Sequence, residues 1–208
     1  MFSLTNSLFL LAIVLLVGAV AFFLKNKSTP QTAHSFANLD FLIKEIKIYI
    51  KNTYPKIVID YQKIEKLTTK SQLLAEDLLI IEDIVVQFAT QKIDMKPSFH
   101  INKEQLWNGY EEMSVPLKGK LPKDFLKRKE LSFKSYGGCC ARCGQKLHIS
   151  NAMTYLLKNV ENGGSYRCEN IAIVCSDCNK VLNTQEENIS KVISSLHIYD
   201  YLISKINH

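Results

Sequence analysis

Apolar residues are most concentrated near the start of the chain, where residues 8–24 (LFLLAIVLLVGAVAFFL) carry no charge. A helix rises about 1.5 Å per residue, so this segment and the uncharged residues before it can cross a hydrocarbon layer about 30 Å thick. We therefore expect a transmembrane helix, with a single-pass anchor over residues 1–24. A cleaved signal peptide and a buried helix are the alternatives, but the segment lacks a basic start and a clear cleavage site.

The residues that flank this segment predict its orientation. Lys25 and Lys27 follow it directly, and no charged side chain precedes it. Because positive flanks favour the cytoplasmic side, the rest of the chain is expected in the cytoplasm, attached to the inner membrane. Residues 25–33 are typical of a polar linker, in which Pro30 interrupts any continuous helix.

Further along the chain, apolar residues recur at helical spacing. The pattern predicts amphipathic helices over Leu39–Ile50 and over Ser71–Phe88, the second capped by Ser71. These two helices can pack together in the core, or one of them can serve a partner. A short helix is expected over Asn102–Met113, and a terminal helix over Glu186–Ile206 can pack on its own module or on the earlier helices.

Positive charge gathers in residues 118–134 of a chain whose net charge is +6. Pro122 suits the first turn of a helix here. The helix could contact the phosphates of DNA or RNA, together with Lys158 and Arg167. A solvated basic helix, or one attracted to anionic lipid, is the alternative. The candidate nucleic-acid contacts are Lys123, Lys127, Arg128, Lys129 and Lys134.

Four of the six cysteines form two C-x-x-C pairs, separated by thirty-one residues. Each pair can place two sulfurs on one edge of a tetrahedron, so the two pairs together predict one structural zinc ion bound by four thiolates. Four protein ligands leave no open position for zinc-driven hydrolysis. Arg142, Lys146 and Lys180 can offset the negative charge, and Gly144 suits a tight turn after the first pair. The predicted ligands are Cys140, Cys143, Cys175 and Cys178.

The cysteine-containing segment resembles the HNH endonuclease family. Its first part reads LPKDFLKRKELSFKSYGGCCARCG, and its later part reads GGSYRCENIAIVCSDCN. The resemblance implies a ββα-metal fold braced by four cysteines. It also implies that Asn170 orients the catalytic loop by hydrogen bonds, that Asn179 stands where a catalytic-metal ligand is found, and that Gly163 and Gly164 are the loop glycines.

The same resemblance implies a catalytic Asp-His pair in the stretch TYLLKNVENGG, with the His about seven residues before Gly163. Tyr155 and Leu156 occupy those positions here. Leucine neither abstracts a proton nor binds Mg²⁺, and tyrosine is a weak base at neutral pH. If the protein is active, His148 is the candidate base, with Asn170, Asn179 and Mg²⁺ or another divalent cation completing the site.

These features together predict an α+β fold with an N-terminal transmembrane helix, a helical middle region and a C-terminal zinc-stapled ββα-metal module. The expected divisions are the anchor at 1–24, the linker at 25–33, a mainly helical region at 34–116 and the HNH-like module with its C-terminal helix at 117–208. The expected function is that of a membrane-anchored, catalytically impaired zinc protein that binds nucleic acid, or a protein partner through residues 34–116. An active DNA endonuclease that uses His148, and a membrane scaffold with a purely structural zinc module, are the alternatives.

Overall fold

The structure is a computed structural model that describes residues 36–68, 76–96, 100–115 and 120–206. Nearly all of these residues belong to one compact unit that starts at Asn38. A single hydrophobic core contains residues from the first helices as well as the buried cysteines near the end of the chain. The expected regions 34–116 and 117–208 therefore share one core.

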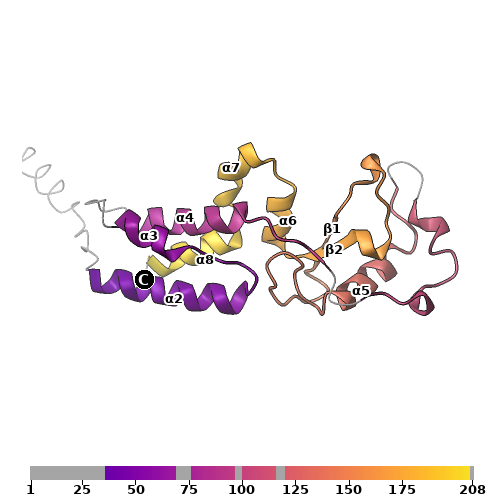
Figure 1. The fold of residues 1–208 in the computed structure, drawn as a ribbon, viewed down its shortest axis with the longest axis horizontal. Helices are drawn as coiled ribbons and strands as arrows, with labels where there is room; N and C mark the ends of the chain where they lie inside the picture. Colours follow the sequence, from indigo (N-terminus) through magenta and orange to yellow (C-terminus); the bar gives the residue numbers. More distant parts are fainter. Residues whose placement is uncertain (1–35, 69–75, 97–99, 116–119, 207–208) are drawn as a thin grey trace, which may run out of the picture. The chain divides into compact units, whose positions relative to one another are not determined.

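Helices from the two ends of the described chain pack together. They are α2 (Phe36–Thr53), α3 (Tyr61–Thr68), α4 (Glu76–Thr90), α7 (Ile189–Ile193) and α8 (His197–Ile206). α4 packs on α3, α7 and α8, and Figure 1 shows α8 running beside α4 and α2. Tyr49 of α2 stacks on Tyr201 of α8, with ring centroids 3.7 Å apart. The terminal helices thus pack on the first helices of the described chain.

The predicted apolar stripes are mainly the faces that α2 and α4 bury. Each fully buried side chain of this size contributes about 1.5–3 kcal/mol, so the stripes are committed to the core and are not left for a partner. Leu78, an apolar residue at helical spacing from Ile81 and Val85, is instead 42% exposed. The buried members are Leu42, Ile43, Ile46 and Ile50 of α2, and Ile80, Ile81, Ile84, Val85 and Phe88 of α4.

The cysteine-rich part contains a small antiparallel sheet between two helices. Its elements are α5 (Phe125–Ser135), β1 (Met153–Leu156), β2 (Ile171–Val174) and α6 (Ser176–Leu182). Met153 lies opposite Val174, and Leu156 lies opposite Ile171. α5 packs on β2 and α6 packs on β1, so every residue of β2 is buried. In chain order the sheet and the helix after it are β1, β2 and α6.

Two expected helices differ in the structure. In place of the helix expected over Asn102–Met113 there are short 3-10 turns, at Lys103–Gln105 and Glu112–Ser114. The backbone between them is extended at Leu106, with ψ 155°, and left-handed at Gly109, with φ 80°. The terminal segment is divided into α7 and α8. Further 3-10 turns lie at Val160–Asn162, Cys168–Asn170 and Glu186–Asn188.

The prediction of a transmembrane helix is corrected. The segment 8–24 lies outside the described residues, and among the helices that the structure does describe, none is both long and apolar enough to cross a membrane. α2, with 18 residues, carries five charged side chains, which a hydrocarbon layer disfavours. The described residues form an α+β fold with a two-stranded sheet but without the transmembrane helix of the predicted fold class. The same finding contradicts the predicted inner-membrane location.

Candidate metal centre

The four predicted ligands come together from two turns of the chain. Cys140 and Cys143 lie in the turn after α5, whereas Cys175 precedes α6 and Cys178 lies in its first turn. All four side chains are buried, and their Sγ atoms lie within 4.8 Å of one another. The Sγ atoms of Cys143 and Cys175 are 3.8 Å apart. The structure therefore confirms a four-cysteine cluster at the predicted positions.

The geometry of this cluster fits a tetrahedral metal ion. Zn–S bonds of about 2.3 Å place the sulfurs of a tetrahedron about 3.8 Å apart. Backbone N–H groups already face the sulfurs, as a thiolate site requires. The amide of Cys175 donates to Cys140 Sγ at 3.3 Å, and the amide of Cys178 donates to Cys175 Sγ at 3.4 Å. The residues present are thus suited to Zn²⁺.

The thiols affect one another strongly because they are packed so closely. Hydrogen bonds from Cys143, and then from Cys175 and Cys178, lower the pKa of Cys140. The pKa values of Cys143 and Cys178 are raised, in each case chiefly by the hydrogen bond with Cys140. Four adjacent sulfurs cannot all ionise without a compensating cation, which a divalent metal supplies while displacing the protons.

Of the three cations expected to offset the cluster's charge, Arg142 contacts it. One guanidinium nitrogen lies 3.6 Å from Cys178 Sγ, and the other donates to the carbonyl oxygens of Phe88, Ala89 and Gln91. Lys180 donates to the carbonyl of Ser195 instead, and Lys146 is exposed. The sequence spacing predicts that Arg142 lies next to the cluster. It does not predict the hydrogen bonds that Arg142 forms with α4.

The turn after the first pair packs against the segment that follows α2. Gly144 has φ 80°, as a tight turn requires, and a Cβ at this position would lie 2.9 Å from Pro55 Cγ. Lys56 donates from its backbone amide to the carbonyl of Cys143 and from Nζ to the carbonyl of Ala141. The cluster therefore lies where the helical part meets the sheet.

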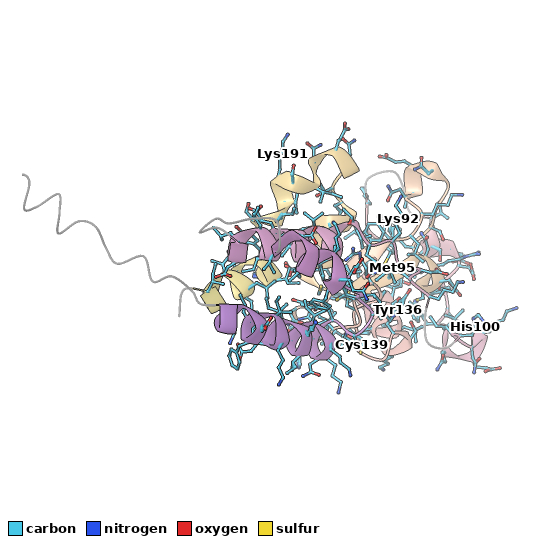
Figure 2. The ribbon with its side chains drawn as sticks, turned by 60° about the vertical axis from the view of Figure 1, so that its left-hand side comes forward. Lys92, Met95, His100, Tyr136, Cys139 and Lys191 are labelled. Atoms are coloured by element: carbon cyan, nitrogen blue, oxygen red, sulfur yellow. The ribbon has the colours of Figure 1, made fainter. Side chains whose placement is uncertain are left out.

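A second contact at this junction comes from the turn between α5 and the first cysteine pair. The Tyr136 hydroxyl donates to the carbonyl of Met95 at 3.3 Å, and Figure 2 labels both residues. Tyr136 is buried, and burial raises the pKa of its hydroxyl to about 12. It remains a neutral donor at physiological pH.

Asn170 holds the loop between β1 and β2. Its Oδ1 accepts from the backbone amide of Lys158, and its Nδ2 donates to the carbonyls of Lys158 and Ser165. A Cβ at Gly164 would lie only 1.9 Å from the carbonyl oxygen of Lys158, so the loop closes around a glycine. Asn170 thus connects Lys158 and Ser165 within one loop, and its role in an HNH-type site stays a prediction.

The other candidate catalytic residues lie on different elements. Tyr155 and Leu156 lie on β1 opposite Ala172 and Ile171. His148 is exposed before β1, with Nδ1 3.0 Å from Ser150 Oγ. Asn179 lies in α6, where its Oδ1 accepts from the Asn183 side chain. Within the described residues, the cysteine cluster is the one group of His, Cys, Asp or Glu side chains placed to hold a metal ion.

Arg128 is not available to a phosphate, which corrects its prediction as a nucleic-acid contact. Its side chain is fully buried and forms an ion pair with Asp124, at 2.8 Å from Nε to Oδ1. It also donates to Ser114 Oγ and to the carbonyls of Tyr110 and Tyr166. Burial alone would raise the pKa of Asp124, but hydrogen bonds from Arg128 and Trp107 outweigh it and lower that pKa.

The other predicted phosphate contacts lie nearer to the surface. Lys127 and Lys134, seven positions apart on α5, are exposed, as is Lys123 in the turn before the helix, whereas Lys129 is half-buried. Lys158 is exposed, and Arg167 pairs with Glu111. The predicted basic surface is therefore smaller than the sequence suggests.

A cavity of about 490 Å³ lies beside Arg142, between the ends of α4 and α6 and the start of α7. In its wall, the hydroxyl of Thr90 donates to the carbonyl of Val86 in α4, and that of Thr184 donates to the carbonyl of Lys180 in α6. The cavity thus presents no free catalytic hydroxyl.

Comparisons with known proteins return no match: no family model, no curated protein and no solved structure is similar to this chain. The resemblance to HNH endonucleases consequently remains a prediction from the residues themselves.

Proposed function

We propose that this protein is a zinc-braced, HNH-like module that binds nucleic acid without cleaving it. The observation that carries the proposal is the ββα unit around the four cysteines, with Asn170 bracing the loop between its strands. Tyr155 and Leu156 stand in β1 where the family resemblance requires an acid and a base. This combination keeps the framework of a nuclease but lacks the groups that activate water.

The metal in this proposal is Zn²⁺, bound by Cys140, Cys143, Cys175 and Cys178. Four buried sulfurs within 4.8 Å of one another, with N–H donors facing them, favour this ion over Mg²⁺ or Ca²⁺, which prefer oxygen ligands. Elemental analysis of the purified chain is expected to find one zinc per chain. A chain that folds without bound zinc would refute this part of the proposal.

The nucleic-acid surface in this proposal includes Lys123, Lys127 and Lys134. Their exposed ammonium groups lie on and beside α5, where they can approach successive phosphates. Retarded migration of DNA or RNA at low salt, weakening steeply as salt rises, would support the proposal. Absence of binding at low salt would contradict it.

Cleavage is tested in the same samples. Plasmid incubated with the protein and Mg²⁺ or Mn²⁺ is expected to stay intact. Metal-dependent nicking that disappears in His148→Ala would show an active nuclease and overturn the non-catalytic proposal.

One observation favours a second candidate, in which the zinc module mainly organises the helices and a protein partner binds elsewhere. Phe41 and Ile48, on one side of α2, are 61% and 53% exposed, and large exposed apolar side chains on one face are typical of a contact surface. Failure to bind nucleic acid, together with loss of a protein complex in Phe41→Ser/Ile48→Ser, would favour this candidate.

A further inference from the structure

The third residue of the first cysteine pair holds the end of α4. Arg142 is only 2% exposed, and its guanidinium donates to Phe88 O at 2.6 Å, Ala89 O at 3.1 Å and Gln91 O at 2.9 Å. The last carbonyls of a helix have no partner within the helix, and a cation is favourable at this negative end of the helix dipole. Arg142 thus caps α4 from within the metal centre.

The third residue of the second cysteine pair, Asp177, caps the other kind of helix end, the N-terminus of α8. Asp177 is 3% exposed, with Oδ1 accepting from the backbone amide of His197 at 2.9 Å and Oδ2 from that of Ile198 at 3.0 Å. The first N–H groups of a helix lack partners within it, and a carboxylate is favourable at its positive end. A residue twenty positions earlier in the chain therefore caps α8.

We propose that metal occupancy of the cysteine cluster controls how α4 and α8 pack, because both caps stand between metal ligands. This inference rests on the zinc ion proposed above. Each capping side chain belongs to a turn whose two cysteines bind the ion, so the bound ion holds that side chain toward its helix. Release of the ion frees both turns, and a buried charge that loses its partners is costly enough to leave the interior. Metal loss would thus loosen helices that contribute no ligand.

Hydrogen exchange of the full chain, with zinc bound and after removal by a chelator, tests this inference. Metal removal is expected to lower amide protection about tenfold or more at the end of α4 (residues 84–91) and in α8, alongside the cysteine turns. Readdition of Zn²⁺ restores it. Loss of zinc, verified by elemental analysis, with unchanged protection in α4 and α8 would overturn the inference.

Variants of the two caps separate this inference from zinc binding itself. Asp177→Asn is expected to keep one zinc per chain while protection falls about tenfold in α8. Arg142→Met also removes the contact with Cys178 Sγ, so it is compared at saturating zinc, where protection of the end of α4 is expected to fall about tenfold. Lys146→Met and Glu187→Gln, which remove exposed charges in the same part of the protein, serve as matched controls and should leave both helices protected. Equal protection in cap variants and controls would overturn the inference.

Arg142→Lys provides a test if Arg142→Met does not fold. It keeps the positive charge but has no planar fork to contact Cys178 Sγ with one nitrogen and the carbonyls of α4 with the other, so at saturating zinc α4 is expected to lose part of its protection. A chain with no zinc refutes the metal proposal and the inference together. A zinc-loaded chain whose cap variants leave α4 and α8 unchanged refutes the inference alone.

Discussion

Arg128 lies in the most basic stretch of the chain, yet its side chain is fully buried beneath the surface lysines of α5. It joins three segments, because its partners are Asp124 before the helix, Ser114 in the preceding region and the carbonyl of Tyr166 in the loop before β2. The guanidinium also lies over the ring of Tyr110, 4.2 Å from its centroid. A single residue thus anchors the region between α4 and α5 to the ββα unit.

Replacing Arg128 tests this role. Arg128→Met is expected to destabilise the protein by about 3–5 kcal/mol, because the carboxylate of Asp124 is left buried without its partner. Lys127→Met, the adjacent exposed position, is expected to change stability by about 0.5 kcal/mol or less. Urea unfolding measures both. A cost for Arg128→Met as small as that of the control would contradict the role of this ion pair.

Gly164 gives a second test for a single residue. Gly164→Ala would place a Cβ 1.9 Å from Lys158 O and 2.8 Å from Asn159 O, so the loop must shift and the hydrogen bonds of Asn170 weaken. The expected cost is about 1–3 kcal/mol in urea unfolding. Asn162→Ala, at an exposed position of the same loop, should cost about 0.5 kcal/mol or less. Equal costs would show that the close approach does not constrain the loop.

At the scale of elements, α5 has one buried face and one basic face. Ser132 and Ser135 face the interior with Arg128, whereas Lys127 and Lys134 are exposed seven positions apart, which is two helical turns. One face of α5 therefore packs in the interior, and the opposite face carries the lysines proposed to contact phosphates.

The lysine pair of α5 can be compared with a pair of identical spacing on α2. Lys127→Gln/Lys134→Gln is expected to lower the slope of log K against log salt by about 2 on duplex DNA, since each phosphate contact contributes about 0.9. Lys44→Gln/Lys51→Gln removes the same charge from exposed positions of α2 and should leave the slope nearly unchanged. The salt dependence is measured by fluorescence anisotropy. An equal change of slope in the two double variants would show that net charge alone governs binding and that α5 is not the nucleic-acid-binding surface.

At the scale of the whole molecule, the helical part and the cysteine-rich part share one hydrophobic core. They are also connected by Arg142 to α4, by Asp177 to α8 and by Lys56 to the first cysteine turn. These connections predict that the described chain unfolds as one cooperative unit while zinc is bound.

Two spectroscopic signals test this cooperativity. The single tryptophan, Trp107, donates to Asp124 beside α5, whereas far-UV circular dichroism is dominated by the helices. The two thermal transitions are expected to coincide in the zinc-loaded protein. Removal of zinc should lower both midpoints substantially, because structural zinc contributes about 10–16 kcal/mol in small zinc-dependent folds. Separate midpoints before zinc removal would indicate independently folding parts.

Much of the candidate site follows from the sequence because its signals are local. The two C-x-x-C pairs identify the four clustered cysteines, and the apolar spacing identifies α2 and most of α4. Asn170 and the loop glycines follow from the HNH resemblance, and the structure places them in one loop. Spacing within a turn or a helix fixes which residues are neighbours, so these features need no knowledge of distant contacts.

Tertiary contacts decided what the charged residues do. Nothing in the spacing around Arg128 distinguishes it from the neighbouring lysines, because its partners at positions 110, 114 and 166 are distant in sequence. The division between α7 and α8 has no glycine or proline to mark it, and the cap that starts α8 comes from Asp177. The sequence by itself determined the four cysteines that cluster and the apolar faces of the helices; the folded chain alone decided which charges are buried, because burial depends on partners that local spacing does not reveal.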